Sequence, residues 1–227
     1  MAAGYALHVG LDWYDADAIG LPRTPPATGA VHAVNAMSAI TSGRGFREVV
    51  SLTDSQATRA RVFHEFDRLA GRLNPADLFV FSLAGHAQPY TRGGQTLRQE
   101  FLLYDYAWHD DEIVDRLASI ASTARVLVVL ESCYADALIT AGPLDRILAA
   151  DILAFAACND SCRAAAAEGG KGLPPFTAAL CKSVDLASDY SDLIDRIKAQ
   201  GLVQEPLMNR KLLKPASTFP EQAPFSI

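Results

Sequence analysis

The sequence predicts an α/β protein with a mostly parallel central sheet and helices on both faces of that sheet. Short apolar runs alternate along the chain with segments of helical period, as expected when crossover helices connect parallel strands. The 227 residues can bury a substantial core, and a composition that is 50% hydrophobic and 20% charged is ordinary for a globular protein. We find no internal repeat and no interdomain linker, so we expect one domain over residues 1–227.

Individual elements follow from the same patterns. The apolar runs predict strands at 5–11, 47–52, 77–83, 125–131 and 152–157. The periodic segments predict helices near 30–42, 55–73, 110–122, 174–184 and 189–200. Two helix starts carry clear signals, because Asp110-Asp111-Glu112 puts negative charge at an N-terminus and Pro174-Pro175 suits a first turn. Breakers and weak periodicity predict surface loops at 20–29 and 163–175.

Charge and cysteine content exclude several kinds of protein. A formal net charge of -6 without any cluster of Lys or Arg offers no concentrated basic surface, so nucleic acid is not an expected partner. The first residues lack the basic start and long apolar region of a signal peptide, and no stretch approaches a membrane-spanning length. We therefore expect a cytoplasmic protein without membrane contact. Four cysteines are too few for a disulfide scaffold, which favours free thiols in a reducing compartment.

Two predicted strands end in residues that can perform chemistry. One leads into Ala84-Gly85-His86-Ala87 and the other into Glu131-Ser132-Cys133. The carboxyl ends of strands in an open α/β sheet line the crevice where ligands bind, so these side chains should converge. An imidazole can accept the proton of a thiol and return it to a leaving amine, which makes His86 and Cys133 a candidate pair. Taken singly, each has a structural alternative: a thiol packed as a small hydrophobe, and a hydrogen-bonded structural histidine.

The order of the motifs is more specific than either strand end. "ADLFVFSLAGHA" resembles the S-G-H-G histidine strand of caspase-like cysteine peptidases, "HDDEIVDRL" resembles their D-D-E-L helix start, and "VLESCYADA" resembles their D-S-C-H-S-G cysteine strand. Cys133 follows His86 by 47 residues (133 minus 86), close to the spacing of about 50 in caspases. The resemblance covers almost the whole chain and is closer to bacterial metacaspases or orthocaspases than to animal caspases. It implies a caspase-hemoglobinase-like fold.

This resemblance assigns a role to each residue of the pair. Cys133 is the expected nucleophile and His86 the expected general acid/base of a cysteine endopeptidase that needs no obligatory cofactor. The backbone N–H groups of Cys133 and Ala87 are the expected oxyanion donors, a contribution worth several kcal/mol in acyl transfer. The family usually has glycine at position 87 and serine at position 84. If the backbone at Ala87 needs a positive φ, alanine costs about 1 kcal/mol there.

Glu131, two residues before the nucleophile, is the candidate substrate-binding residue. Metacaspases usually have aspartate there, in the pocket for a basic side chain. The resemblance therefore implies cleavage after Arg, with Lys weaker because a carboxylate pairs with guanidinium in a bidentate geometry. The second acid that the family supplies after its first strand is not evident, because the matching position is Ala33. The alternative is a Glu131 that points away from the cleft and pairs with a surface cation.

An activating calcium ion is the one metal that the resemblance suggests. Its candidate ligands are Asp105, Asp110 and Asp111, since Ca²⁺ takes several hard oxygen ligands. The alternative is that these residues cap helices or are solvated carboxylates. The expected partners are a protein or peptide substrate and a regulatory protein.

Other residues and other functions have weaker support. Cys158 and Cys162 lack the second ligand pair that a structural zinc needs, Cys181 is expected in the core beside Phe176 and Leu180, and His8 is expected to be structural. A catalytically silent caspase-like adaptor or scaffold is the main rival function, motivated by the changes at positions 84 and 87. A small-molecule hydrolase is a weaker rival, because the G-x-S-x-G nucleophile motif is absent.

Overall fold

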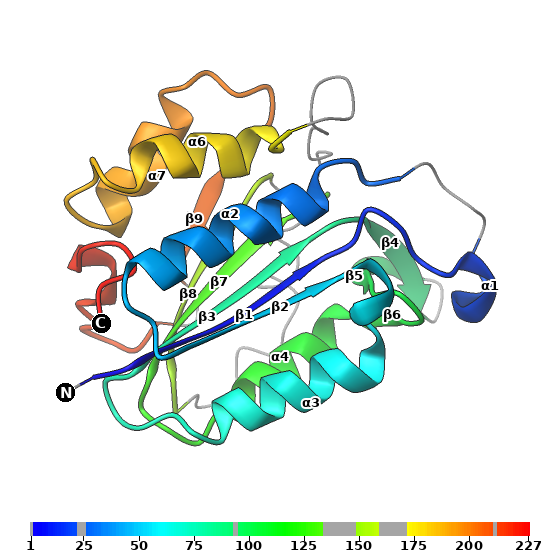
Figure 1. Cartoon of the computed structure of the whole chain (residues 1–227), viewed down its shortest axis with the longest axis horizontal. Coiled ribbons are helices and arrows are strands. Elements are labelled where there is room, and N and C mark those ends of the chain that lie inside the picture. Colours follow the sequence, from blue (N-terminus) through cyan, green and yellow to red (C-terminus); the bar gives the residue numbers. More distant parts are fainter. Residues whose placement is uncertain (1, 22–25, 93–94, 134–148, 159–171, 211–212) are drawn as a thin grey trace.

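The computed structural model describes residues 2–21, 26–92, 95–133, 149–158, 172–210 and 213–227. A six-stranded sheet crosses the molecule, with five parallel strands and one antiparallel strand at an edge (Figure 1). In spatial order its strands are β2 (Glu48–Thr53), β1 (Gly4–Gly10), β3 (Leu78–Ala84), β7 (Arg125–Glu131), β8 (Asp151–Ala156) and β9 (Leu207–Asn209). The five parallel strands are the predicted ones, and each boundary lies within one residue of the prediction.

Helices cover both faces of this sheet, as predicted. On one face lie α2 (Ala30–Gly43), α6 (Pro175–Ser183) and α7 (Tyr190–Lys198), and on the other lie α3 (Arg59–Ala70) and α4 (Asp110–Ala118) (Figure 1). The acidic residues at 110–112 form the first turn of α4, and Pro175 begins α6. Two predicted helices are shorter than expected, because a 3-10 helix (Asp54–Gln56) precedes α3 and because α4 ends at Ala118.

Each face of the sheet has its own apolar core. Tyr5, Leu7 and Val9 of β1 lie in the core that contains α3 and α4, whereas Ala6 lies in the core beneath α2 and α7. Successive side chains of a strand point to opposite faces, so burial on both faces requires apolar residues at every position. This explains why the strands appear in the sequence as continuous apolar runs.

Close helix packing over β1 depends on a glycine. A Cβ at Gly10 would lie 2.6 Å from the carbonyl oxygen of Ala30 and 2.5 Å from Cγ2 of Val34. Real Cβ atoms do not approach that closely, so glycine allows the start of α2 to rest on the end of β1. The carboxyl edge of the sheet is therefore built with α2 directly above it.

The sequence did not predict a second, antiparallel sheet. It consists of β4 (Ala87–Arg92), β5 (Gln95–Leu102) and β6 (Ala107–His109), and it follows the histidine strand directly. The short helix α1 (Ala16–Ile19), strand β9 and a 3-10 helix (Phe219–Glu221) were also missed. Most of the predicted loop at 163–175 lies outside the described residues, as do residues 22–25 of the other predicted loop.

None of the helices in the described part of the chain combines the length and the apolar character that a membrane crossing requires.

Candidate active site

His86 and Cys133 leave the sheet from matching positions of neighbouring parallel strands. The β3–β7 register pairs Ala84 with Glu131, and each candidate residue stands two positions beyond its strand's paired residue. The pairing continues past the strands, since the backbone N–H of Gly85 donates to the carbonyl oxygen of Glu131 at 3.1 Å. Adjacent strands lie about 4.8 Å apart, so the register brings the two turns to the same place at the carboxyl edge.

The turn that carries His86 requires glycine at position 85. Gly85 has φ 147°, and a Cβ there would lie 3.2 Å from the carbonyl oxygen of Leu11. The histidine itself is half-buried, and its ring meets the ring of Tyr14 edge-on, with centroids 6.0 Å apart. Its carbonyl oxygen accepts a hydrogen bond from the N–H of Leu102 at 3.0 Å. The loop after β1 therefore contacts the imidazole ring through Tyr14, and β5 holds the backbone of His86 through Leu102.

Alanine at positions 84 and 87 fits the backbone and the packing. Ala87 does not adopt a positive φ, so the steric cost considered for it does not arise; it begins β4 opposite Phe101. Ala84 is buried against Ala30 and Ala33 of α2, where a serine hydroxyl would be placed among methyl groups. Ala33, which stands where the family usually has a second acidic residue, is itself buried and is part of this apolar contact.

Cys133 follows a strand end that is tied to its neighbour. The N–H of Ala157 donates to the carbonyl oxygen of Leu130 at 2.8 Å, and the thiol of Cys158 donates to the carbonyl oxygen of Ser132 at 3.4 Å. Cys158 is fully buried, whereas Cys133 is partly exposed. Of these two thiols, Cys133 is the one that solvent or substrate can reach.

Glu131 has a role that the sequence did not predict. Its side chain is only 6% exposed, and Oε2 accepts hydrogen bonds of 2.7 Å from both the backbone N–H and the hydroxyl of Thr177 in α6. The alternative of a surface ion pair is therefore wrong. Burial raises the pKa of this carboxyl to about 7, against the opposing effect of the Thr177 hydrogen bonds. Oε1 is also buried and has no hydrogen-bond partner.

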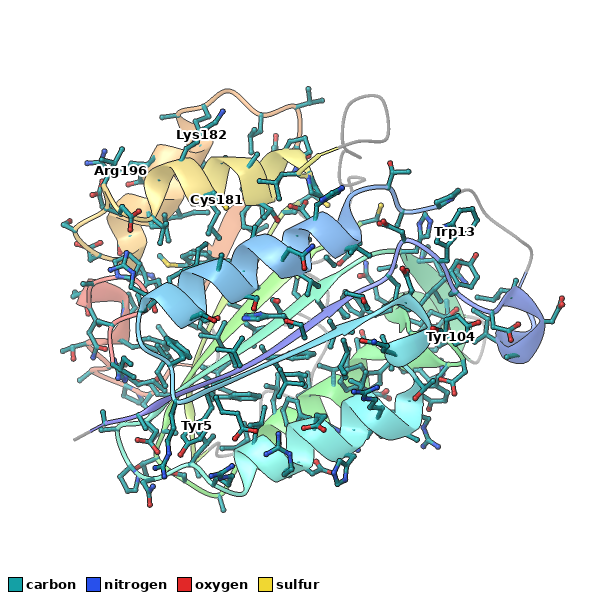
Figure 2. The ribbon with its side chains drawn as sticks, in the orientation of Figure 1. Tyr5, Trp13, Tyr104, Cys181, Lys182 and Arg196 are labelled. Atoms are coloured by element: carbon teal, nitrogen blue, oxygen red, sulfur yellow. The ribbon has the colours of Figure 1, made fainter. Side chains whose placement is uncertain are left out.

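An acidic and aromatic cleft opens where β1 ends. Its volume is about 380 Å³, and its lining residues are Asp12, Trp13, Tyr14, Asp15, Ala16, Asp17 and Tyr104. Trp13 is 60% exposed, and Figure 2 shows Trp13 and Tyr104 at the same end of the molecule, beyond the parallel strands. Because Tyr14 also contacts His86, the cleft adjoins the candidate site.

This cleft was not predicted, although the sequence carries a signal for it. Three aspartates and two aromatic residues stand together in "LDWYDAD", directly after the first predicted strand. The side chain of Asp54 fixes this loop, accepting hydrogen bonds from the N–H groups of Asp12 at 2.9 Å and Trp13 at 3.0 Å. The sequence pattern did not predict that Asp54 contacts this loop, because Asp54 is 42 residues away from Asp12.

The structure does not gather the three aspartates considered as calcium ligands into one group of side chains. Asp105 accepts a hydrogen bond of 2.7 Å from the N–H of Arg59, at the start of α3. Asp110 is buried and accepts hydrogen bonds from the N–H groups of Gln99 and Asp111. Across the described ranges, no group of three or more His, Cys, Asp or Glu side chains could hold a metal ion. Of the alternative considered for these residues, helix capping describes Asp105, whereas Asp110 is a buried acceptor and not a solvated carboxylate.

The remaining candidate residues have structural surroundings. His8 is fully buried, with Nδ1 2.8 Å from Oγ of Ser82 and Nε2 3.0 Å from Oγ1 of Thr41. Burial lowers its pKa to about 3, as expected for a structural imidazole. Cys181 lies on α6, where Figure 2 labels it, and its side chain is only partly buried, so its assignment to the core was wrong. Cys162 lies outside the described residues.

Comparison with solved structures identifies the fold. Protein GSU0716 from Geobacter sulfurreducens superposes with a TM-score of 0.84 at 21% sequence identity, over 99% of both chains. Caspase-1 from Spodoptera frugiperda superposes with a TM-score of 0.65 at 13% identity, over 92% of this chain and 87% of that chain. No protein family and no curated protein matches the chain by sequence. The chain therefore has a caspase-like fold, as predicted, with a mostly parallel six-stranded sheet flanked by helices.

Proposed function

We propose that the chain is a caspase-like cysteine endopeptidase, of the metacaspase or orthocaspase type, in which Cys133 is the nucleophile and His86 the general acid/base. The observation that carries this proposal is the β3–β7 register, which starts the two turns from matching positions at the carboxyl edge. The half-buried state of both residues supports it, since catalytic groups must be reachable by substrate. The protein acts as one peptidase domain, in the cytoplasm, on a protein or peptide substrate.

The chemistry follows from the residue types at this edge. His86 takes the proton of the Cys133 thiol, and the thiolate attacks the carbonyl carbon of the scissile peptide bond. The backbone N–H groups of Cys133 and Ala87 donate hydrogen bonds to the oxyanion of the tetrahedral intermediate. His86 then returns the proton to the leaving amine, and a water molecule that it activates hydrolyses the thioester. No step requires a metal ion or another cofactor.

We further propose that the enzyme cleaves after Arg, more weakly after Lys, and not after Asp. Two features support this preference: Oε1 of Glu131 has no hydrogen-bond donor, and the cleft beside His86 is lined by three aspartates. A guanidinium would supply the missing donor, whereas a substrate carboxylate would meet like charges. Because Oε1 is buried, this contact requires the atoms that cover it to move aside when substrate binds.

The proposed activity is tested with fluorogenic peptides that differ only in the residue before the cut. Wild type should cleave the Arg peptide fastest, and both Cys133→Ala and His86→Ala should abolish turnover. Glu131→Gln should reduce the ratio of Arg to norleucine cleavage. An unchanged ratio in that variant, or preferential cleavage after Asp, would remove Glu131 from substrate selection. Absence of turnover with every peptide would favour the caspase-like adaptor.

A further inference from the structure

Glu131 connects the end of the nucleophile strand to the start of a helix far along the chain. Thr177 is the third residue of α6, and the residue before that helix, Pro174, provides no side-chain cap. The first backbone N–H groups of a helix have no partner within the helix, so they need an external acceptor. The carboxylate of Glu131 serves as this acceptor from another element, with a second hydrogen bond from the Thr177 hydroxyl.

The main chain of the same residue contacts the histidine turn. The carbonyl oxygen of Glu131 accepts a hydrogen bond from the N–H of Gly85, which directly precedes His86. Glu131 thus bonds to the histidine turn through its backbone and to α6 through its side chain, and Cys133 follows two residues later. Both side-chain bonds are buried, where an unpartnered donor is costly and a satisfied one holds its geometry firmly.

We propose that Glu131 and Thr177 form a positioning pair, in which the bond to α6 fixes the Cys133 turn relative to the His86 turn. This inference rests on the proposed function, since it concerns the geometry of the proposed dyad. It assigns the two carboxylate oxygens of Glu131 to different tasks. Oε2 holds the site together through Thr177, and Oε1 is the oxygen that has no hydrogen-bond partner and that substrate would reach once the atoms covering it move aside.

Thr177→Val tests the positioning pair without touching the dyad or Oε1. Valine keeps the side-chain shape and the backbone N–H but removes the hydroxyl donor. The variant should lower kcat for the Arg peptide about tenfold while KM stays within about twofold, because displacement of catalytic groups by a fraction of an ångström lowers rate more than binding. Thr177→Ser, which restores the hydroxyl, should recover most of the lost rate.

A matched control lies at the other end of the same helix. The hydroxyl of Ser183 is buried and accepts a hydrogen bond of 3.0 Å from Nε2 of Gln200. Ser183→Ala therefore also removes a buried hydroxyl from α6, but it should leave kcat unchanged. A loss of kcat in Ser183→Ala equal to that in Thr177→Val would show a general effect of a weakened helix and would overturn the proposal.

Alkylation of Cys133 by iodoacetamide separates this proposal from the proposed function. The rate of modification, followed by mass spectrometry at neutral pH, depends on the fraction of Cys133 present as thiolate and needs no peptide substrate. If the dyad exists, His86→Ala should slow alkylation, and the positioning pair predicts that Thr177→Val slows it in the same direction. Slowing in His86→Ala with wild-type rates in Thr177→Val would overturn the positioning pair alone. Wild-type rates in His86→Ala would overturn the dyad and the positioning pair together.

Discussion

Glu131→Gln should change how stability depends on pH, in a direction that the structure determines. Burial raises the pKa of this carboxyl from its ordinary value of 4.5 to about 7. Between these two values the folded protein keeps a proton that the unfolded chain has released. The free energy of unfolding of the wild type should therefore fall as pH rises through this window.

The magnitude follows from the same two pKa values. Raising an acid's pKa from 4.5 to about 7 makes its ionisation about 3 kcal/mol more costly in the folded protein than in the unfolded chain. Glutamine cannot ionise, and its carbonyl oxygen can still accept from Thr177. The difference in unfolding free energy between wild type and Glu131→Gln should thus shift by about 3 kcal/mol between pH 4.5 and pH 8, in favour of the variant at the higher pH.

Urea denaturation at pH 4.5, 6 and 8 measures this difference, and comparing variants cancels the other titrating groups. Glu48→Gln is the control, because the hydrogen bond from Arg68 lowers the pKa of Glu48. The ionised Glu48 side chain stabilises the folded protein at neutral pH, and this stabilisation is lost only as pH falls toward and below its lowered pKa. The difference in unfolding free energy between wild type and Glu48→Gln should therefore stay constant from pH 6 to 8. If the unfolding free energies of wild type and Glu131→Gln change in parallel with pH, the claim that burial raises the pKa of Glu131 is refuted.

Three further predictions concern other parts of the site and its support. Gly85→Ala should lower the free energy of unfolding by roughly 1–3 kcal/mol in urea, since an L residue is strained at φ 147° and its Cβ would approach Leu11; wild-type stability would contradict that turn. Burial holds the pKa of His8 at about 3, so stability should decline as pH falls below 6.5, and His8→Gln should flatten this decline in acid denaturation. Asp17→Asn should reduce kcat/KM for the Arg peptide about two- to fivefold and weaken its dependence on salt, whereas an unchanged salt dependence would exclude the cleft from substrate attraction.

The central sheet could be predicted because its strands are buried on both faces. Residues 78–84 and 125–131 are apolar at nearly every position, because one side of each strand packs into one core and the other side into the second core. The sheet formed by β4, β5 and β6 has no continuous apolar run, because "AQPYTR" and "QTLRQEFL" mix polar and apolar residues. Its position beside the histidine turn is visible only in the structure.

The candidate pair could be predicted for a related reason. A parallel register turns two strand ends that are distant in sequence into neighbours, so His86 and Cys133 could be matched once their strands were recognised. The hydrogen bond between Glu131 and Thr177 could not be predicted from a strand register, since Thr177 is 46 residues further along and belongs to a helix. Nothing in the residue pattern distinguishes a carboxylate that lines a pocket from one that caps a helix.

Covalent labelling tests the central claim most directly. A peptide ending in Arg with a thiol-reactive warhead is incubated with wild type, Cys133→Ala and His86→Ala, and the modified residue is identified by mass spectrometry. The proposed dyad predicts stoichiometric labelling of Cys133 in the wild type, strongly slowed labelling in His86→Ala and none in Cys133→Ala, with a matched Asp warhead reacting much more slowly. Labelling that persists in Cys133→Ala, or equal rates for wild type and His86→Ala, would contradict a peptidase built on Cys133 and His86.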